Sequence, residues 1–201
     1  MCGRFSLASE PSALFEEFGL YPPAAWEPRY NIAPTQDVLV LAAGRSGARM
    51  GMVRWGLVPP GAPDARGGAR LINARGETLE RRPAFRDAYR RRRCLVLADG
   101  FYEWRVQGGG KQPVRIRLAD GAPFALGGLW ERWRGPGGET LGTCTIVTTP
   151  PSEAVATLHD RMPLLLGRAE RARWLDPGAG AAELRALVRP YPGGDLIWHP
   201  V

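Results

Sequence analysis

Residues 94–106 read Cys-Leu-Val-Leu-Ala-Asp-Gly-Phe-Tyr-Glu-Trp-Arg-Val, two strand-like runs on either side of an Asp-Gly break. The first run is residues 94–98 and the second is residues 101–106. In an extended second run, Phe101 and Glu103 project to one face and Tyr102 and Trp104 to the other. The stretch therefore predicts two consecutive strands.

Similar runs recur along the chain. Further strands are expected at residues 38–42, 49–55, 114–118, 124–130 and 143–148, with a hairpin turn at residues 108–110. Helices are expected at residues 9–18, capped by Ser9, and at 83–92, 152–158, 168–175 and 181–188, and a loop at 59–70. This order predicts an α+β fold: one β-rich domain over residues 1–201, with a curved, barrel-like mixed or antiparallel sheet flanked by short helices.

Composition narrows the class of protein. A chain of 201 residues suits a single domain, which we expect to be monomeric. Its three cysteines (Cys2, Cys94, Cys144) and two histidines (His159, His199) suit neither a disulfide framework nor a zinc module, so we expect free thiols, no metal and no cofactor. No apolar run is long enough to cross a membrane and no secretory signal is recognisable, which predicts a cytoplasmic protein.

The chain is strongly basic, with a net charge of +7 and a pI near 10.0. Such a charge favours a polyanion as partner, although all basic residues except Lys111 are arginines, a bias that codon composition also produces. Arginine suits phosphate because its planar fork donates two parallel hydrogen bonds. We interpret most of the run Arg90–Arg93 as the solvated end of a helix.

Cys2 directly follows the initiator methionine. Removal of Met1 places its thiol beside a free α-amine, whose pKa of about 7.8 leaves far more of it unprotonated at neutral pH than a lysine amine. Such an amine condenses with an aldehyde to a Schiff base, and the thiolate can close on the imine carbon to give a thiazolidine ring. A lone cysteine is otherwise more often a small buried hydrophobic residue.

Three other segments contain polar residues suited to chemistry. Asn73 and Arg75, two residues apart, project to one side of an extended segment. Glu103 lies among aromatic residues, where poor solvation raises a carboxyl pKa and suits the group to donate a proton. His159 follows a predicted helix. Each also has a structural interpretation: Glu103 in an ion pair, His159 as a helix cap and Asn73 in a turn.

Six motifs occur in order between residues 2 and 163. They are Cys2-Gly3-Arg4-Phe5, Tyr30-Asn31-x-x-Pro34, Trp55-Gly56-Leu57-x-Pro59, Asn73-Ala74-Arg75-x-Glu77, Arg93-Cys94 through Gly100-Phe101-Tyr102-Glu103-Trp104, and His159-Asp160-Arg161-Met162-Pro163. Together they resemble the SOS response-associated peptidase (SRAP) family of abasic-site shielding proteins.

The resemblance implies a protein that binds single-stranded DNA and captures the ring-opened aldehyde of an abasic site as a thiazolidine DNA–protein crosslink. It assigns the amine and thiol to Cys2, general acid/base catalysis to Glu103, assistance in proton transfer to His159, and orientation of Cys2 and the sugar to Asn73. It also implies a DNA-repair role, loss of Met1 by self-cleavage or an aminopeptidase, and an available abasic-site lyase reaction at the same Schiff base.

The resemblance further implies that Arg4 and Arg75 hold the phosphates that flank the abasic site, and that the cytoplasmic protein is nucleoid-associated when bound to DNA. One position departs from the family: Gly61 stands where many members have a tryptophan. A base stacked on an aromatic side chain gains about 1–3 kcal/mol, so Gly61 puts the tightness of single-strand binding in doubt.

Two other functions fit parts of the pattern. Cys2 could be the nucleophile of an N-terminal nucleophile hydrolase that acts on amides, with its own α-amine as the base. Alternatively, the chain could be a non-catalytic basic module in which Cys2 is incidental.

Overall fold

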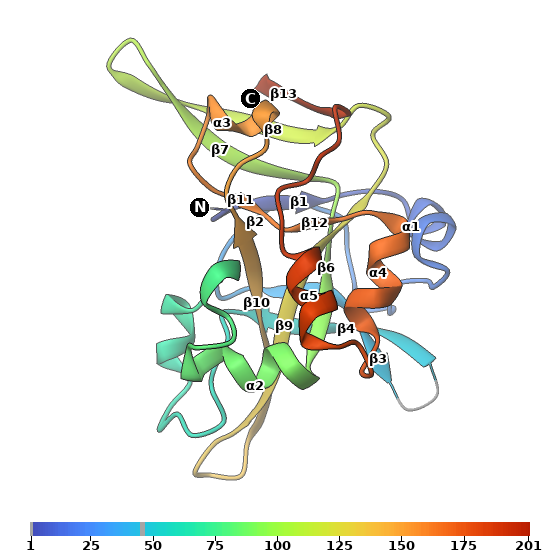
Figure 1. Ribbon diagram of the computed structural model, residues 1–201, viewed down its shortest axis with the longest axis vertical. Helices are drawn as coiled ribbons and strands as arrows, with labels where there is room; N and C mark the ends of the chain where they lie inside the picture. Colours follow the sequence, from blue (N-terminus) through green and yellow to red (C-terminus); the bar gives the residue numbers. More distant parts are fainter. Residues whose placement is uncertain (1, 45–46) are drawn as a thin grey trace.

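Five strands close into a barrel at the centre of the computed structural model, which describes residues 2–44 and 47–201 (Figure 1). Antiparallel pairs join β3 to β4, β3 to β6, β6 to β9 and β9 to β10, and a parallel pair between β10 and β4 completes the ring. The strands are β3 (Asp37–Gly44), β4 (Gly47–Trp55), β6 (Arg93–Ala98), β9 (Phe124–Arg134) and β10 (Thr140–Thr149). The predicted barrel-like mixed sheet of an α+β domain is confirmed.

A second sheet packs against one end of the barrel. Its order is β13-β8-β7-β1-β2, with all neighbours antiparallel. The strands are β1 (Phe5–Leu7), β2 (Arg29–Ile32), β7 (Gly100–Gln107), β8 (Gly110–Leu118) and β13 (Leu196–Pro200). Phe5 of this sheet meets Trp55 of the barrel edge to face, with ring centroids 5.2 Å apart, so the two sheets share one core.

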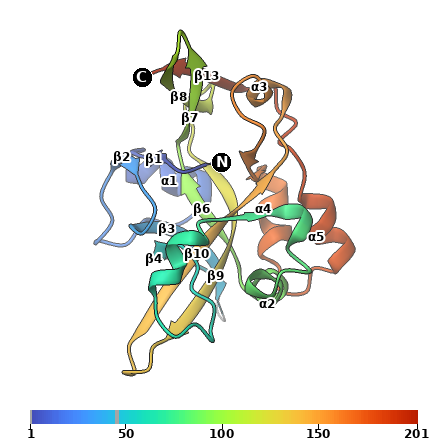
Figure 2. The ribbon, with the colours of Figure 1, turned by 90° about the vertical axis from the view of Figure 1, so that its left-hand side faces the viewer.

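The predicted hairpin turn joins β7 to β8. Gly108 and Gly109 have φ of 57° and 80°, values that suit glycine because it has no Cβ. The hairpin projects from the upper end of the molecule, and the β9–β10 hairpin from the lower end (Figure 1, Figure 2).

Asp99 is the corner where the chain leaves β6 for β7. Its carboxylate accepts hydrogen bonds from the Ser6 hydroxyl at 2.6 Å, the Ser9 N–H at 2.9 Å and the Arg115 guanidinium at 2.8 Å. The same group therefore fixes the start of the chain, the β6–β7 corner and strand β8. Buried carboxylates are stable only with such partners.

Short helices surround the sheets. They are α1 (Pro11–Phe18), α2 (Pro83–Arg91), α3 (Glu153–Ala156), α4 (Arg168–Leu175), α5 (Ala181–Leu187) and the 3-10 helices η1 (Arg66–Arg70) and η2 (Gly76–Thr78). Helices α2 and α4 lie against the outside of the barrel, and α3 lies at the upper end near β7 and β8 (Figure 2). Three short strands complete the fold: β5 (Asn73–Arg75), β11 (Met162–Pro163) and β12 (Leu165–Leu166). No helix in the described ranges has both the length and the apolar character needed to span a bilayer.

The structure corrects two local expectations. Helix α1 begins at Pro11 with Glu10 at its N-cap, because the Ser9 N–H and hydroxyl bind Asp99 instead. The interpretation of most of the run Arg90–Arg93 as a solvated helix end holds for Arg90 and Arg91, which are exposed in the last turn of α2, but not for Arg93. It is 4% exposed at the start of β6, and its guanidinium donates to the carbonyl oxygens of Tyr89, Arg90, Trp174 and Asp176.

Candidate active site

Cys2 is completely buried just before strand β1, beside the junction of the two sheets. The Tyr102 N–H donates to the Arg4 carbonyl at 2.9 Å, which holds the segment between Cys2 and β1 against β7. Burial, and then the nearby charge of Glu103, raise the pKa of the Cys2 thiol well above its ordinary value. The thiol is therefore protonated at neutral pH and needs a base before it can act as a nucleophile. The expected removal of Met1 concerns a residue outside the described ranges.

Asn73 anchors Cys2 through its side chain. It lies at the start of β5, which pairs in parallel with the end of β10, and its Nδ2 donates to the Cys2 carbonyl oxygen at 2.8 Å. Its Oδ1 is buried and has no hydrogen-bond partner among the described residues. A buried acceptor without a partner lowers stability by about 1–3 kcal/mol, so a hydrogen-bond donor that binds next to this oxygen would be stabilised.

Glu103 lies in β7 with its side chain turned inward. Alternate burial along the strand, with Phe101 and Glu103 buried and Trp104 exposed, confirms the predicted division of faces. Burial raises the pKa of Glu103 and the charge of His159 lowers it, with the increase prevailing. The predicted increase in the pKa of Glu103 is therefore confirmed. When ionised, Glu103 raises the pKa of the Cys2 thiol, as described above.

His159 follows helix α3 and faces the same region. Its backbone N–H donates to the Val155 carbonyl at 3.1 Å, and its Nδ1 accepts the Arg161 N–H at 2.9 Å. The same Nδ1 lies 2.8 Å from Oδ1 of the exposed Asp160. Since Nδ1 accepts only when unprotonated and donates only when protonated, it can make one of these two bonds at a time.

The two predicted phosphate-binding arginines line two different pockets next to these groups. Arg4 donates to Asn31 Oδ1 at 2.9 Å, and both line a pocket of about 330 Å³ together with Tyr30, Tyr102 and Trp104. Arg75 is exposed and lines another pocket of about 320 Å³, together with Asn73, Thr78, Arg82 and Phe85. The structure thus brings the six predicted site residues to one region, with cationic groups at its edges.

An ion pair that the sequence did not reveal supports the site. Arg161 grips Glu77 with two hydrogen bonds, at 2.6 and 3.0 Å, and donates to the Thr148 carbonyl at 2.7 Å. The bidentate pair ties the His159 segment to β5 and η2, and it holds the pKa of Glu77 below its usual range. Opposite charges inside two of the six motifs were the only sign of it in the sequence.

The expected loop at residues 59–70 is irregular to Ala65 and ends in η1. Gly61 is exposed, and a Cβ added there would have open space around it. Beneath this loop the Trp133 indole donates to the Ala62 carbonyl at 2.8 Å.

The described residues hold no group of three or more His, Cys, Asp or Glu side chains placed to bind a metal ion. All three cysteines are buried free thiols.

Comparison with known proteins gives a consistent result. A family model described as "SOS response associated peptidase (SRAP)" matches residues 1–201. The chain is 42% identical over 206 residues to "Abasic site processing protein YoqW" of Bacillus subtilis, covering all of this chain and 92% of that protein. It is 32% identical over 209 residues to "Abasic site processing protein YedK" of Escherichia coli, with the same coverage.

Solved structures agree in fold. A protein from Bacteroides thetaiotaomicron superposes with a TM-score of 0.90 at 23% identity, over all of this chain and 92% of that one. A protein from Bordetella bronchiseptica superposes with a TM-score of 0.86 at 27% identity, over all of this chain and 99% of that one.

Proposed function

Because the chain belongs to the SOS response associated peptidase (SRAP) family, we propose that it processes abasic sites in DNA, as the names of its relatives indicate for them. In this proposal it binds single-stranded DNA and captures the ring-opened sugar through Cys2 after loss of Met1. The observation that carries the proposal is the 2.8 Å hydrogen bond from Asn73 to the Cys2 carbonyl, beside a buried glutamate whose pKa is raised.

The first step is attack of the Cys2 α-amine on C1′ of the sugar aldehyde. The orphaned Oδ1 of Asn73 is the acceptor that would orient this amine, since the other end of the same amide already holds the Cys2 carbonyl. Glu103 in its protonated form then donates to the carbinolamine hydroxyl, which leaves as water and yields an iminium ion.

The second step closes the ring. The carboxylate of Glu103, ionised by the first step, accepts the proton of the Cys2 thiol, and the thiolate attacks the imine carbon. One water is lost, one C–N and one C–S bond form, and Glu103 is reprotonated. Because the pKa of the Cys2 thiol is raised, ring closure needs such a base.

Other residues have supporting roles. His159 would assist proton transfer, and Arg4 and Arg75 would bind the phosphates on either side of the abasic site. Exclusion of competing β-elimination depends on the speed of thiol closure, so abasic-site lyase activity is a side reaction of the same intermediate. Loss of Met1, by self-cleavage or by an aminopeptidase, is the peptidase step that exposes the amine.

The test is incubation of the protein with a single-stranded oligonucleotide carrying one abasic site, followed by denaturing electrophoresis. An intact-base strand is the control. A heat-resistant shifted band with the abasic strand alone is the expected result. Absence of the band, with Met1 confirmed removed and DNA binding detected, would reject the mechanism in favour of amide chemistry at Cys2.

A further inference from the structure

Helix α2 carries a line of arginines that begins at the candidate active site. Arg82, Arg86 and Arg90 are spaced four residues apart, and all are exposed. Phe85 and Tyr89 of the same helix are buried against the body of the protein. Arg86 and Arg90, four residues apart, lie on one face of α2 about 6 Å apart along its axis, and Arg82 is the extended N-cap residue that directly precedes the helix. The three exposed arginines form a cationic stripe that begins at the N-terminal end of α2 and continues along it.

The stripe is continuous with the site. Arg82 shares the pocket of about 320 Å³ with Asn73 and Arg75, and Asn73 is bonded to Cys2. Arg86 and then Arg90 lie progressively farther from Arg82 along α2. The stripe thus starts beside the proposed reaction centre and leads away from it.

Neighbouring carboxylates do not neutralise this charge. Glu77 is bound by Arg161, Glu80 by Arg185 and Asp64 by Arg66. Asp87 is the acidic residue on α2, and its Oδ1 lies 3.6 Å from Nε of Arg86. Both side chains are largely exposed, so this ion pair contributes little attraction. Within the described ranges, neither Arg82 nor Arg90 has a carboxylate within salt-bridge distance.

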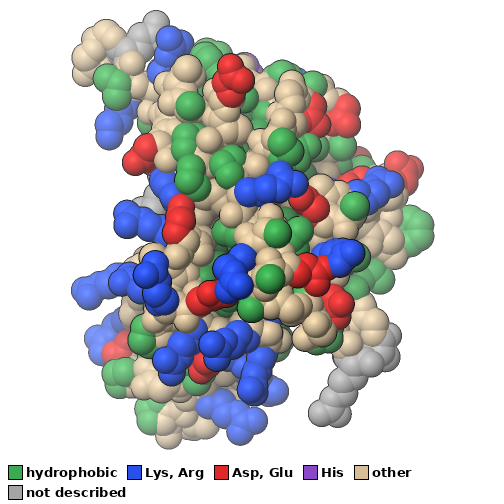
Figure 3. Space-filling view, viewed as in Figure 1, with side chains coloured by type: hydrophobic (Ala, Val, Ile, Leu, Met, Phe, Trp, Pro, Cys, Tyr) green, Lys and Arg blue, Asp and Glu red, His purple; other side chains and the backbone are tan. Residues whose placement is uncertain are grey.

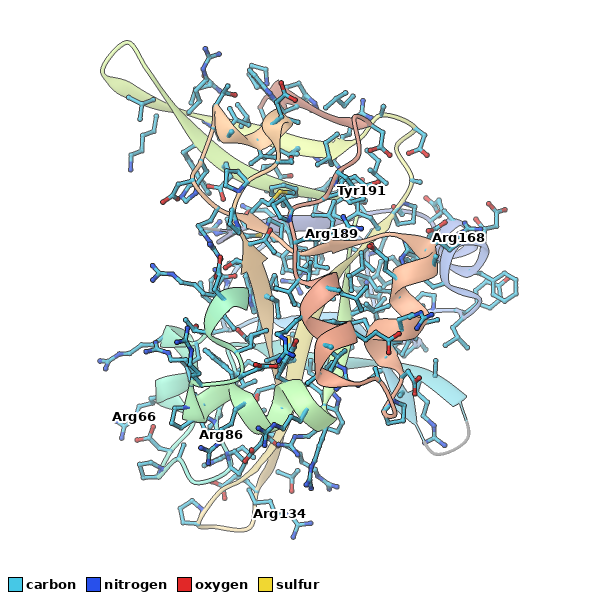
Figure 4. The ribbon with its side chains drawn as sticks, viewed as in Figure 1. Arg66, Arg86, Arg134, Arg168, Arg189 and Tyr191 are labelled. Carbon is cyan, nitrogen blue, oxygen red and sulfur yellow. The ribbon has the colours of Figure 1, made fainter. Side chains whose placement is uncertain are left out.

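The figures show the same asymmetry. Lys and Arg side chains gather on the lower left of the face in Figure 3, over α2 and the segments before it. Arg66 and Arg86 lie in this region, whereas Arg168 lies on the opposite side of the view (Figure 4).

We propose that the stripe Arg82–Arg86–Arg90 binds the phosphates of one flank of the DNA strand, extending the contact several nucleotides beyond the abasic site. The inference rests on the proposed function, because the abasic site must be held at Cys2 for one flank of the strand to reach α2. The exposed, regularly spaced guanidinium groups of the stripe suit the repeating phosphates of an extended strand. They bind the charge of the phosphates and do not contact the bases, so they confer no sequence specificity. The contact therefore depends on strand direction: the stripe binds either the 5′ or the 3′ flank and not both.

The experiment compares three strands that carry a tetrahydrofuran analogue of the abasic site, which has no aldehyde. One has a long flank on the 5′ side only, one on the 3′ side only, and one has short flanks. Affinity is measured by fluorescence anisotropy over a range of salt concentrations, for the wild-type protein and for Arg82→Gln/Arg86→Gln/Arg90→Gln.

The triple variant is expected to lose about tenfold in affinity at low salt for one of the two long-flank strands. Its salt slope for that strand should fall by about 2, since each phosphate contact in a single strand contributes about 0.7. Binding of the other two strands should change by less than about twofold. Arg168→Gln/Arg173→Gln/Arg189→Gln, which removes the same charge from the α4–α5 side, is the control and should show no flank dependence.

Equal losses on all three strands, equal losses in the control variant, or no flank dependence in the wild type would overturn the proposal. Thermal denaturation of both variants verifies folding. Crosslinking of the short strand with a true abasic site is measured separately. Its absence would reject the proposed chemistry, whereas its presence without flank dependence would reject only the stripe.

Discussion

Replacement of Asn73 separates the positioning of Cys2 from the binding of DNA. Asn73→Asp keeps the shape of the side chain but replaces the donor that holds the Cys2 carbonyl at 2.8 Å with an oxygen that repels it. A polar group left without its partner in a partly buried site costs about 1–3 kcal/mol. If that cost appears in the transition state, capture of the aldehyde slows by about 5- to 150-fold.

The companion variant Asn73→Ala also removes Oδ1, the buried acceptor without a partner. If Oδ1 orients the α-amine, Asn73→Ala should slow capture at least as much as the lost donor alone does. Its stability should fall by about 1–3 kcal/mol, because the Cys2 carbonyl loses its donor, and the removal of the unsatisfied acceptor adds no further loss.

The assay is the single-turnover rate of heat-stable crosslink formation at saturating protein, with affinity measured separately on the tetrahydrofuran strand. The reasoning requires slower capture with affinity within about twofold of the wild type, since Asn73 contacts Cys2 and the proposal gives it no phosphate. Capture within twofold of the wild type in both variants would refute it. Parallel losses of rate and affinity would instead make Asn73 a DNA-binding residue.

Three further predictions concern other parts of the molecule. Because burial raises the pKa of Glu103, its ionisation at a pH above the pKa of a glutamate in the unfolded chain lowers the free energy of unfolding, by about 1.4 kcal/mol for each unit by which the pKa is raised. Glu103→Gln should therefore raise Tm near about pH 7.5 and not near about pH 4, while it slows capture. Equal changes in Tm at both pH values would contradict this cause. Gly61→Trp has open space for its side chain and should tighten single-strand binding about fivefold or more by stacking, in contrast to Gly61→Ala; unchanged affinity by anisotropy would show that the loop does not reach the bases. Arg93→Met leaves four carbonyl oxygens without their charged donor and should lower the free energy of unfolding by about 3 kcal/mol or more; a loss under about 1 kcal/mol in urea denaturation would show that other donors replace it.

The long strands and most helices were predictable because each has its own pattern. Residues 101–104 alternate in burial as their sequence predicts, whereas Arg105 and Val106 are both exposed, and helix α4 has the predicted bounds. The extended segment at residues 73–75 was predicted, but its pairing with β10 as β5 was not, and strand β11 was not predicted, since two or three residues carry no periodicity. The burial of Arg93 was not predictable because two of its four carbonyl partners, Trp174 and Asp176, are more than eighty residues away.

The site was predictable as a set of residues but not as a geometry. The types of residue at positions 2, 73, 103 and 159, and the order of the six motifs, indicated a set of candidate side chains that the fold brings into one region. The contact between Asn73 and Cys2 joins residues 71 apart, and that between Arg161 and Glu77 residues 84 apart. Such contacts depend on barrel closure and on the Asp99 corner, and no local pattern records them.

The central claim is that Cys2 contributes both its amine and its thiol to one ring. Mass spectrometry of the intact product tests it directly, with wild-type protein and Cys2→Ala each incubated with an abasic single strand. For the wild type, we expect a heat-stable conjugate whose mass equals the protein without Met1 plus the strand minus one water. For Cys2→Ala, we expect only an imine, which survives denaturation after borohydride reduction. A heat-stable conjugate from unreduced Cys2→Ala, or a wild-type conjugate that retains Met1, would contradict it.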